Sequence, residues 1–184
     1  MVAAHHKIVF TGPVGAGKTT AIAALSDEPP VSTDEVASDF ARALKPNTTV
    51  ALDYGVMRLG DGQKIHLYGT PGQERFDFMW DILTEGGIGL VLLVDGSRSA
   101  PHQDMLFFIE AFREFIRRTA LAIGVTRTDL ASDFSLDDLH RHLAPLGLNV
   151  PVFEVDARNR DDVGTLVRAL LHSLDPGIDD HARA

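Results

Sequence analysis

Cysteine is absent from this 184-residue sequence, which excludes disulfides and the prenyl or palmitoyl anchors that need a thiol. Residue 2 is not glycine, so myristoylation is excluded as well. No apolar run is long enough to cross a bilayer, and residues 1–6 show no signal-peptide pattern. Acidic residues outnumber basic ones, giving a net charge of −9, which opposes binding to nucleic acid or anionic membrane. We therefore expect a cytoplasmic protein with no nucleic-acid partner and no membrane insertion.

Hydrophobic residues make up 45% of the chain, an ordinary value for a globular protein. Its length fits one domain with a sizeable core, which we place at residues 1–175, followed by a polar tail at 176–184. Apolar strand-like runs alternate with helical patterns, and this alternation predicts an α/β fold with a mostly parallel sheet. A hairpin pattern with Gly60-Asp61-Gly62 as its turn predicts one antiparallel edge strand among six.

The apolar patterns predict the following elements. Strands are expected at 7–11, 49–59, 64–68, 88–94, 120–125 and 152–155, and helices at 17–25, 35–43, 103–118, 135–143 and 161–174.

A phosphate-binding loop follows the first predicted strand and precedes the first predicted helix. Its residues are Gly12, Pro13, Val14, Gly15, Ala16, Gly17, Lys18 and Thr19, with Thr20 next to it. Glycines let several backbone N–H groups converge on a β-phosphate without interfering side chains. In this G-x-x-x-x-G-K-T spacing the lysine reaches the β- and γ-phosphates and the threonine hydroxyl ligates Mg²⁺. The fold class is thus predicted to be the three-layer P-loop NTPase fold.

Four further segments follow the loop in a characteristic order. They are Asn47-Thr48-Thr49-Val50, Gly69-Thr70-Pro71-Gly72-Gln73-Glu74-Arg75-Phe76, Thr126-Arg127-Thr128-Asp129 and Val155-Asp156-Ala157-Arg158. Together with the loop they resemble the five nucleotide-site motifs of Ras-like small GTPases over essentially the whole chain. The resemblance implies that Thr49 binds Mg²⁺ and that Gly72 offers its N–H to the γ-phosphate. It also implies that Gln73 orients the attacking water.

Gly69 departs from that pattern, because an aspartate that supports Mg²⁺ normally stands there. Asp53 lies on the strand that pairs antiparallel with the strand ending near Gly69. Residues of paired strands face one another, so we predict that the Asp53 carboxylate fills the vacated space as a metal ligand beside Thr19 and Thr49. Asp95, at the end of a buried strand, is a more distant alternative supporter of the metal.

Asp129 is the predicted selector of the base. A carboxylate accepts hydrogen bonds from both N1–H and the exocyclic amine of guanine. Thr126 and Arg127 replace the usual Asn and Lys of this motif, and Arg127 can still lie over the base. In the last segment the resemblance implies that Ala157 presents its N–H to the guanine O6, with Arg158 beside it. The bound ligands expected are therefore GTP or GDP with Mg²⁺.

Within the Ras-like class, the Gly69–Gln73 variant together with Thr49 and Asp53 resembles a bacterial and archaeal group. That group comprises relatives of the signal-recognition-particle receptor β-subunit and the conservon GTPases, with the gliding-polarity GTPases as cousins. The resemblance implies a roadblock-type regulatory partner and an effector at the 47–50 and 69–76 segments. Arg42 and Arg75 lie in or near these segments without being obvious arginine fingers, and Arg98 is interpreted as a surface loop residue.

The leading functional hypothesis is a GTP/GDP molecular switch with slow intrinsic hydrolysis. Lys18, Gly72 and Gln73 would be its catalytic residues. Val14 stands where Ras-like enzymes commonly keep glycine, and a branched side chain there crowds Gln73 and any incoming arginine. One alternative is an adaptor locked on its nucleotide, which Gly69 and Val14 favour. Another is a P-loop kinase, although no arginine-rich lid segment is visible.

Overall fold

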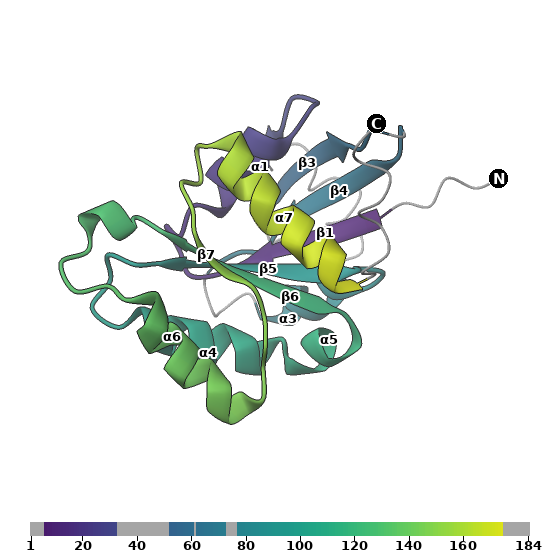
Figure 1. Ribbon diagram of the computed structural model, residues 1–184. Coiled ribbons are helices and arrows are strands. Elements are labelled where there is room, and N and C mark those ends of the chain that lie inside the picture. Colours follow the sequence, from purple (N-terminus) through teal and green to yellow (C-terminus); the bar gives the residue numbers. More distant parts are fainter. Residues whose placement is uncertain (1–5, 33–51, 61, 73–76, 175–184) are drawn as a thin grey trace.

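The computed structural model describes residues 6–32, 52–60, 62–72 and 77–174. They form an α/β domain with one twisted sheet between two helical layers (Figure 1). The strand order is β2-β3-β4-β1-β5-β6-β7. All six predicted strands are present and the predicted fold class is confirmed. A two-residue strand, β2, adds a short seventh strand at the edge.

The centre of the sheet is parallel and mostly buried. β1 pairs in parallel with both β4 and β5, and β5 pairs in parallel with β6. Every residue of β5 and β6 is buried, which explains their uninterrupted apolar sequences. Parallel strands end at the same edge of the sheet, and ligands bind there in open α/β folds. The strands are β1 (His6–Thr11), β2 (Val31–Ser32), β3 (Asp53–Arg58), β4 (Lys64–Gly69), β5 (Gly89–Asp95), β6 (Ala120–Thr126) and β7 (Val152–Glu154).

Helices cover both faces of the sheet (Figure 1). On one face α1 (Lys18–Leu25) and α7 (Arg160–Leu174) bury Ile22, Leu25 and Leu166 against the sheet. On the other face Trp80, Phe108 and Phe112 belong to a second core cluster. The helices of that face are α3 (Phe78–Thr84), α4 (Pro101–Ala111), α5 (Arg113–Arg118) and α6 (Leu136–Leu143), and short 3-10 turns lie at Thr128–Leu130 and Ala144–Leu146.

The predicted hairpin is confirmed, and its register is informative. β3 and β4 pair antiparallel, with Asp53 directly opposite Gly69. The turn closes with Gly62 N–H donating to the Leu59 carbonyl at 2.9 Å. The start of β3 and the end of β4 therefore meet at the edge of the sheet where β1 runs into α1.

Two other expectations have different outcomes. The predicted helix 103–118 is two helices, because the backbone departs from helical geometry at Phe112 (φ −102°, ψ 15°). The apolar periodicity continues across this break, since Phe108, Phe112 and Phe115 all face the core. The predicted helix at 35–43 and the tail at 176–184 lie outside the described residues.

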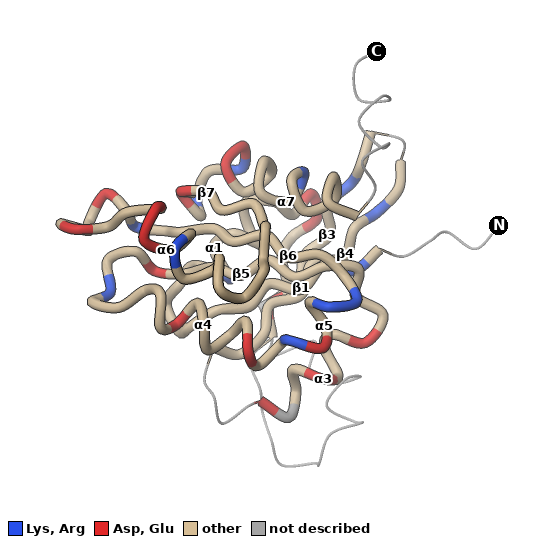
Figure 2. Tube along the Cα trace, turned by 60° about the horizontal axis from the view of Figure 1, so that its bottom comes forward, with Lys and Arg blue, Asp and Glu red and all other residues tan. Residues whose placement is uncertain are grey.

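Acidic residues gather in the first turns of α6 and α7 (Figure 2), with Asp137 and Asp138 on one and Asp161 and Asp162 on the other. Negative charge at a helix N-terminus stabilises the helix by opposing its dipole. Across the described ranges, no helix combines the length and apolar character needed to span a bilayer.

Candidate nucleotide site

The loop between β1 and α1 has the backbone geometry that a phosphate cradle needs. Gly12 has φ 139°, and a Cβ placed on it would lie 2.1 Å from the Leu93 carbonyl oxygen. Only glycine fits this position, because a side chain would clash with the backbone of β5. Gly15 and Gly17 also have positive φ values of 80° and 97°. The loop predicted from sequence therefore folds as a tight turn at the carboxyl end of the central strand.

Lys18 is buried inside this loop and bonds to it. Its Nζ donates to the carbonyl oxygens of Gly12 at 2.7 Å and Pro13 at 2.8 Å. Burial lowers the pKa of Lys18 to about 8, although the charge of Asp53 opposes the shift. The ammonium group thus turns back onto its own loop, where phosphate oxygens would replace two carbonyl acceptors.

Thr19 and Asp53 meet beside the loop. The Thr19 hydroxyl donates to Asp53 Oδ2 at 2.6 Å. A Cβ placed on Gly69 would lie 3.0 Å from the Asp53 Cβ and 3.2 Å from Oδ2. The Asp53 carboxylate therefore occupies the space that a side chain at Gly69 would need. No cluster of three or more His, Asp or Glu side chains suited to a metal is found in the described residues, so a cation here would rely on phosphate and water for its other ligands.

Gly72 lies directly against the loop. A Cβ at this position would be 2.6 Å from the backbone nitrogen of Val14 and 2.8 Å from Lys18 Nζ. The Pro71 carbonyl next to it accepts from the indole N–H of Trp80 at 3.2 Å. Trp80 stacks in turn on Phe112, with ring centroids 5.0 Å apart. Pro71 is therefore bonded to helix α3 through Trp80, while the neighbouring Gly72 contacts the phosphate loop.

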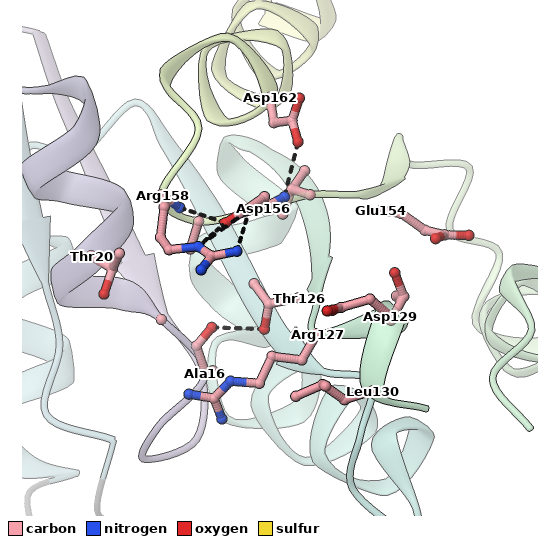
Figure 3. Close-up of a pocket in the computed structure, with 14 residues that line it drawn as sticks. Ala16, Thr20, Thr126, Arg127, Asp129, Leu130, Glu154, Asp156, Arg158 and Asp162 are labelled. Carbon is pink, nitrogen blue, oxygen red and sulfur yellow. Dashed lines mark hydrogen bonds and ion pairs between the residues drawn. The ribbon is translucent and has the colours of Figure 1, made fainter. Parts of the chain in front are cut away.

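A cavity of about 760 Å³ opens beside the loop (Figure 3). Its wall combines the start of α1 with the loops that follow β6 and β7, as expected at the carboxyl edge of a parallel sheet. The lining residues are Ala16, Gly17, Thr20, Thr126, Arg127, Thr128, Asp129, Leu130, Glu154, Val155, Asp156, Ala157, Arg158 and Asp162.

Internal bonds fix the loop after β6. Arg127 adopts a left-handed backbone (φ 56°), and its guanidinium donates to Asp95 Oδ2 at 2.7 Å. Asp95 also accepts from the Ser97 N–H and hydroxyl at 2.9 and 2.6 Å. Burial alone would raise the pKa of Asp95, but these hydrogen bonds from Ser97 and Arg127 lower it overall. Asp95 is thus engaged in holding Arg127.

Thr126 connects the base side of the cavity to the phosphate loop. Its hydroxyl donates to the Ala16 carbonyl at 3.0 Å and lies 3.3 Å from the Val94 carbonyl. A Cβ on Gly17 would lie 3.0 Å from the Ala157 Cβ. Thr126 at the end of β6 and Ala157 after β7 therefore both contact the phosphate loop directly. The sequence alone did not predict this contact for Thr126.

The loop after β7 brings a second arginine to the cavity (Figure 3). Arg158 Nε and Nη2 donate to the Asp156 carboxylate at 2.9 and 2.7 Å, and Asp156 Oδ1 accepts the Arg158 backbone N–H at 2.9 Å. Hydrogen bonding from Arg158 lowers the pKa of Asp156 to about 2. Asp129 attracts Arg158 electrostatically, yet its exposed carboxylate accepts no hydrogen bond from the described part of the chain. Asp129 and Glu154 are the two lining carboxylates that accept no hydrogen bond from the described residues.

The structure thus gathers most of the predicted site residues in one region. Pro13, Val14, Gly15 and Lys18 form the phosphate loop, and Ala157 lines the cavity. Thr49 and Gln73 lie outside the described residues. Sequence reasoning gave Asp156 no role of its own, and the only signal was its two-residue spacing from Arg158, which suits a side-chain turn.

Comparison with known proteins identifies a different family from the one that the motifs resemble. Residues 28–171 match the model of a family described as "Conserved hypothetical ATP binding protein". The matched segment begins after the phosphate loop. The chain is also 32% identical over 98 residues to an uncharacterized protein of Methanocaldococcus jannaschii. That alignment covers 53% of this chain and 56% of the relative, so the chain matches about half of that protein's length.

The resemblance to Ras-like small GTPases of the signal-recognition-particle receptor β-subunit and conservon group is therefore wrong. The family match over 28–171 points to another P-loop family. The motifs misled because one fold hosts many unrelated functions, and Thr126–Asp129 lies at the edge of the sheet where open α/β folds bind ligands. The GTP/GDP switch and the roadblock-type partner were implied by that group, and both lose their basis with it. Nucleotide binding and the P-loop fold are supported.

Proposed function

The chain belongs to the family described as conserved hypothetical ATP binding proteins, and from this premise we propose a more specific function. It binds purine nucleoside triphosphates with Mg²⁺, prefers GTP, and hydrolyses GTP slowly to GDP and phosphate. The observation that carries the proposal is the open Asp129 carboxylate in a cavity continuous with the phosphate loop. A triphosphate on the loop would place its base beside this residue.

The choice of guanine follows from hydrogen-bonding chemistry. Guanine presents two adjacent donors, N1–H and N2–H₂, and a carboxylate accepts both. Adenine presents one donor beside an acceptor nitrogen, so one Asp129 oxygen would face a lone pair without a bond. A mismatch of this kind discriminates strongly, because the polar groups of the site are left unpaired. The family description names ATP, and a preference for ATP is the competing outcome.

At the other end of the nucleotide, Lys18 exchanges its two loop carbonyls for phosphate oxygens and gains charge-assisted bonds. Thr19 and Asp53 supply a hydroxyl and a carboxylate 2.6 Å apart, the oxygen ligands that Mg²⁺ prefers. When bound there, Mg²⁺ would neutralise charge on the β- and γ-phosphates. Gly72, already against the loop, would donate its N–H to the γ-phosphate.

Slow hydrolysis is proposed from the residues around the terminal phosphate. Lys18 and the loop amides stabilise charge that develops as the bond to the leaving group breaks, and Gln73 is proposed to orient the attacking water. Val14 is 61% exposed at the mouth of the loop, where its branched side chain restricts the approach of a catalytic group from outside.

Asp129→Asn tests the choice of base. Asparagine presents an N–H₂ donor where the carboxylate accepts, so GTP affinity should fall about a hundredfold. Xanthosine triphosphate carries a carbonyl in place of the guanine amine and should become the better ligand. Asp133→Asn, on the same exposed loop but outside the cavity lining, is the matched control. Unchanged GTP affinity in Asp129→Asn would reject this base pocket.

Phosphate release from GTP-loaded protein in a single turnover tests the reaction. A slow, Mg²⁺-dependent release supports the proposal. Stable GTP with no release would instead identify an adaptor locked on its nucleotide. Transfer of the phosphate to a small acceptor would identify a kinase.

A further inference from the structure

A second hollow lies on the outer side of the phosphate loop. Val14, Gly72, Arg98 and Phe107 are among the residues that line this groove of about 450 Å³. A Cβ placed on Gly72 would lie 2.6 Å from the backbone nitrogen of Val14, so these two residues meet closely at the loop. The groove therefore opens beside the residues that would contact the terminal phosphate, and it shares no lining residue with the base cavity.

Arg98 is the only Lys or Arg among the described residues that line this groove. It follows β5 directly, in a turn closed by its N–H donating to the Asp95 carbonyl at 3.3 Å. Asp95 in turn bonds to Ser97 and Arg127. The backbone that carries Arg98 is thus anchored to the base pocket, while the Arg98 side chain is half-exposed.

The present partner of Arg98 holds it weakly. Its Nε lies 3.2 Å from Asp104 Oδ2, in a single contact rather than a bidentate pair. This Oδ2 is buried and accepts no hydrogen bond within the described ranges. A half-exposed single-contact ion pair is worth little, so a more strongly charged acceptor in the groove would displace it.

We propose that Arg98 is a catalytic residue supplied by the chain itself, which leaves Asp104 and binds the γ-phosphate as GTP is hydrolysed. This assignment rests on the proposed GTP hydrolysis. Water attacks the γ-phosphorus, the bond to the β–γ bridging oxygen breaks, and GDP departs with the electron pair while the water protons remain with phosphate and solvent. The Arg98 guanidinium donates to the oxygens on which negative charge accumulates, as an arginine finger does.

Substitutions of Arg98 and Asp104 should change the rate of hydrolysis in opposite directions. Arg98→Ala should slow single-turnover phosphate release about a hundredfold and leave GTP and GDP affinities within about twofold. Arg98→Lys should recover part of the rate, because the charge remains but the planar fork is lost. Asp104→Asn should raise the rate severalfold, since it frees Arg98 without removing it. Arg117→Ala, an exposed arginine of α5 paired with Glu114, is the control.

A second readout does not depend on turnover. GDP with aluminium fluoride mimics the transferring phosphoryl group, and Arg98→Ala should lose its tight capture while GDP alone still binds. Wild-type rate and wild-type capture in Arg98→Ala would overturn the assignment of Arg98 alone. A wild-type chain that binds GTP but neither releases phosphate nor captures GDP with aluminium fluoride would overturn the proposed hydrolysis, and the role of Arg98 with it.

Discussion

The base end and the phosphate end of the proposed nucleotide site are built in different ways. At the base end Arg127 is held by Asp95 and Arg158 by Asp156, while the Asp129 carboxylate stays open. At the phosphate end Lys18 donates to two carbonyls of its own loop, and Gly72 lies close against Val14. The side chains of the base end are therefore already in place without a ligand. At the phosphate end, by contrast, Lys18 is bonded to the loop itself.

This difference assigns different energetic tasks to the two ends. A preassembled pocket spends little free energy on ordering side chains and can discriminate between bases. At the phosphate end, Lys18 must give up its two hydrogen bonds to loop carbonyls before it binds phosphate oxygens. Much of the free energy of the new bonds therefore only compensates for the bonds that are lost. We expect substitutions at the base end to change selectivity, and substitutions or pH changes at the phosphate end to change overall affinity.

Of the three changes that sharpen this comparison, Asp53→Asn should have the largest effect. The amide keeps the shape of the side chain but removes the charge beside Thr19 and Lys18. The Mg²⁺ concentration that half-saturates GTP binding should rise roughly 10- to 100-fold, while GTP affinity without Mg²⁺ stays the same or improves. A Mg²⁺ titration monitored by calorimetry measures this, with Asp81→Asn on α3 as the control. An unchanged midpoint would remove Asp53 from the metal site.

The second-largest effect is expected from pH, because Lys18 should take up a proton when the nucleotide binds. Burial sets the pKa of Lys18 to about 8 in the free protein, and phosphate oxygens would hold it protonated in the complex. The complex then binds more protons than the free protein above pH 8, so affinity falls as pH rises. Between pH 7 and pH 9 the loss should reach about tenfold.

Calorimetry in two buffers of different ionisation enthalpy measures this uptake. Nearly one proton should be taken up at pH 9 and only a small fraction of one at pH 7. Binding at pH 9 without proton uptake would contradict the lowered pKa that burial gives Lys18 at the phosphate end.

The smallest effect is expected from Asp156→Asn. Asparagine retains the oxygen that accepts the Arg158 backbone N–H and loses the charge that orients the guanidinium. Because the pair is exposed, GTP affinity should fall only about two- to threefold, and the affinity for inorganic tripolyphosphate should not change. Asp137→Asn on α6 is the control. An equal loss for both ligands would mean that Asp156 acts on the whole site rather than on the base end.

The sequence predicted those parts of the site that are determined by residues close together in the chain. The phosphate loop follows from its spacing and flanks, and the meeting of Asp53 with Gly69 follows from hairpin geometry alone. The break at Phe112 could not be predicted, because the apolar periodicity runs through it.

The pairing of Arg127 with Asp95 could not be predicted either, since these residues are 32 positions apart and meet only through the parallel pairing of β5 with β6. The family assignment failed for a related reason. Four-residue motifs at the ends of strands report where a nucleotide lies on the fold, and proteins of several families share that location.

Titration of ligand-stripped protein with GTP and ATP in the presence of Mg²⁺ tests most directly whether the phosphate loop and Asp129 bind one nucleotide together. We predict saturable binding of GTP at one site per chain and binding of ATP at least about a hundredfold weaker. Equal affinity for the two nucleotides, or heat from neither, would contradict the proposed site.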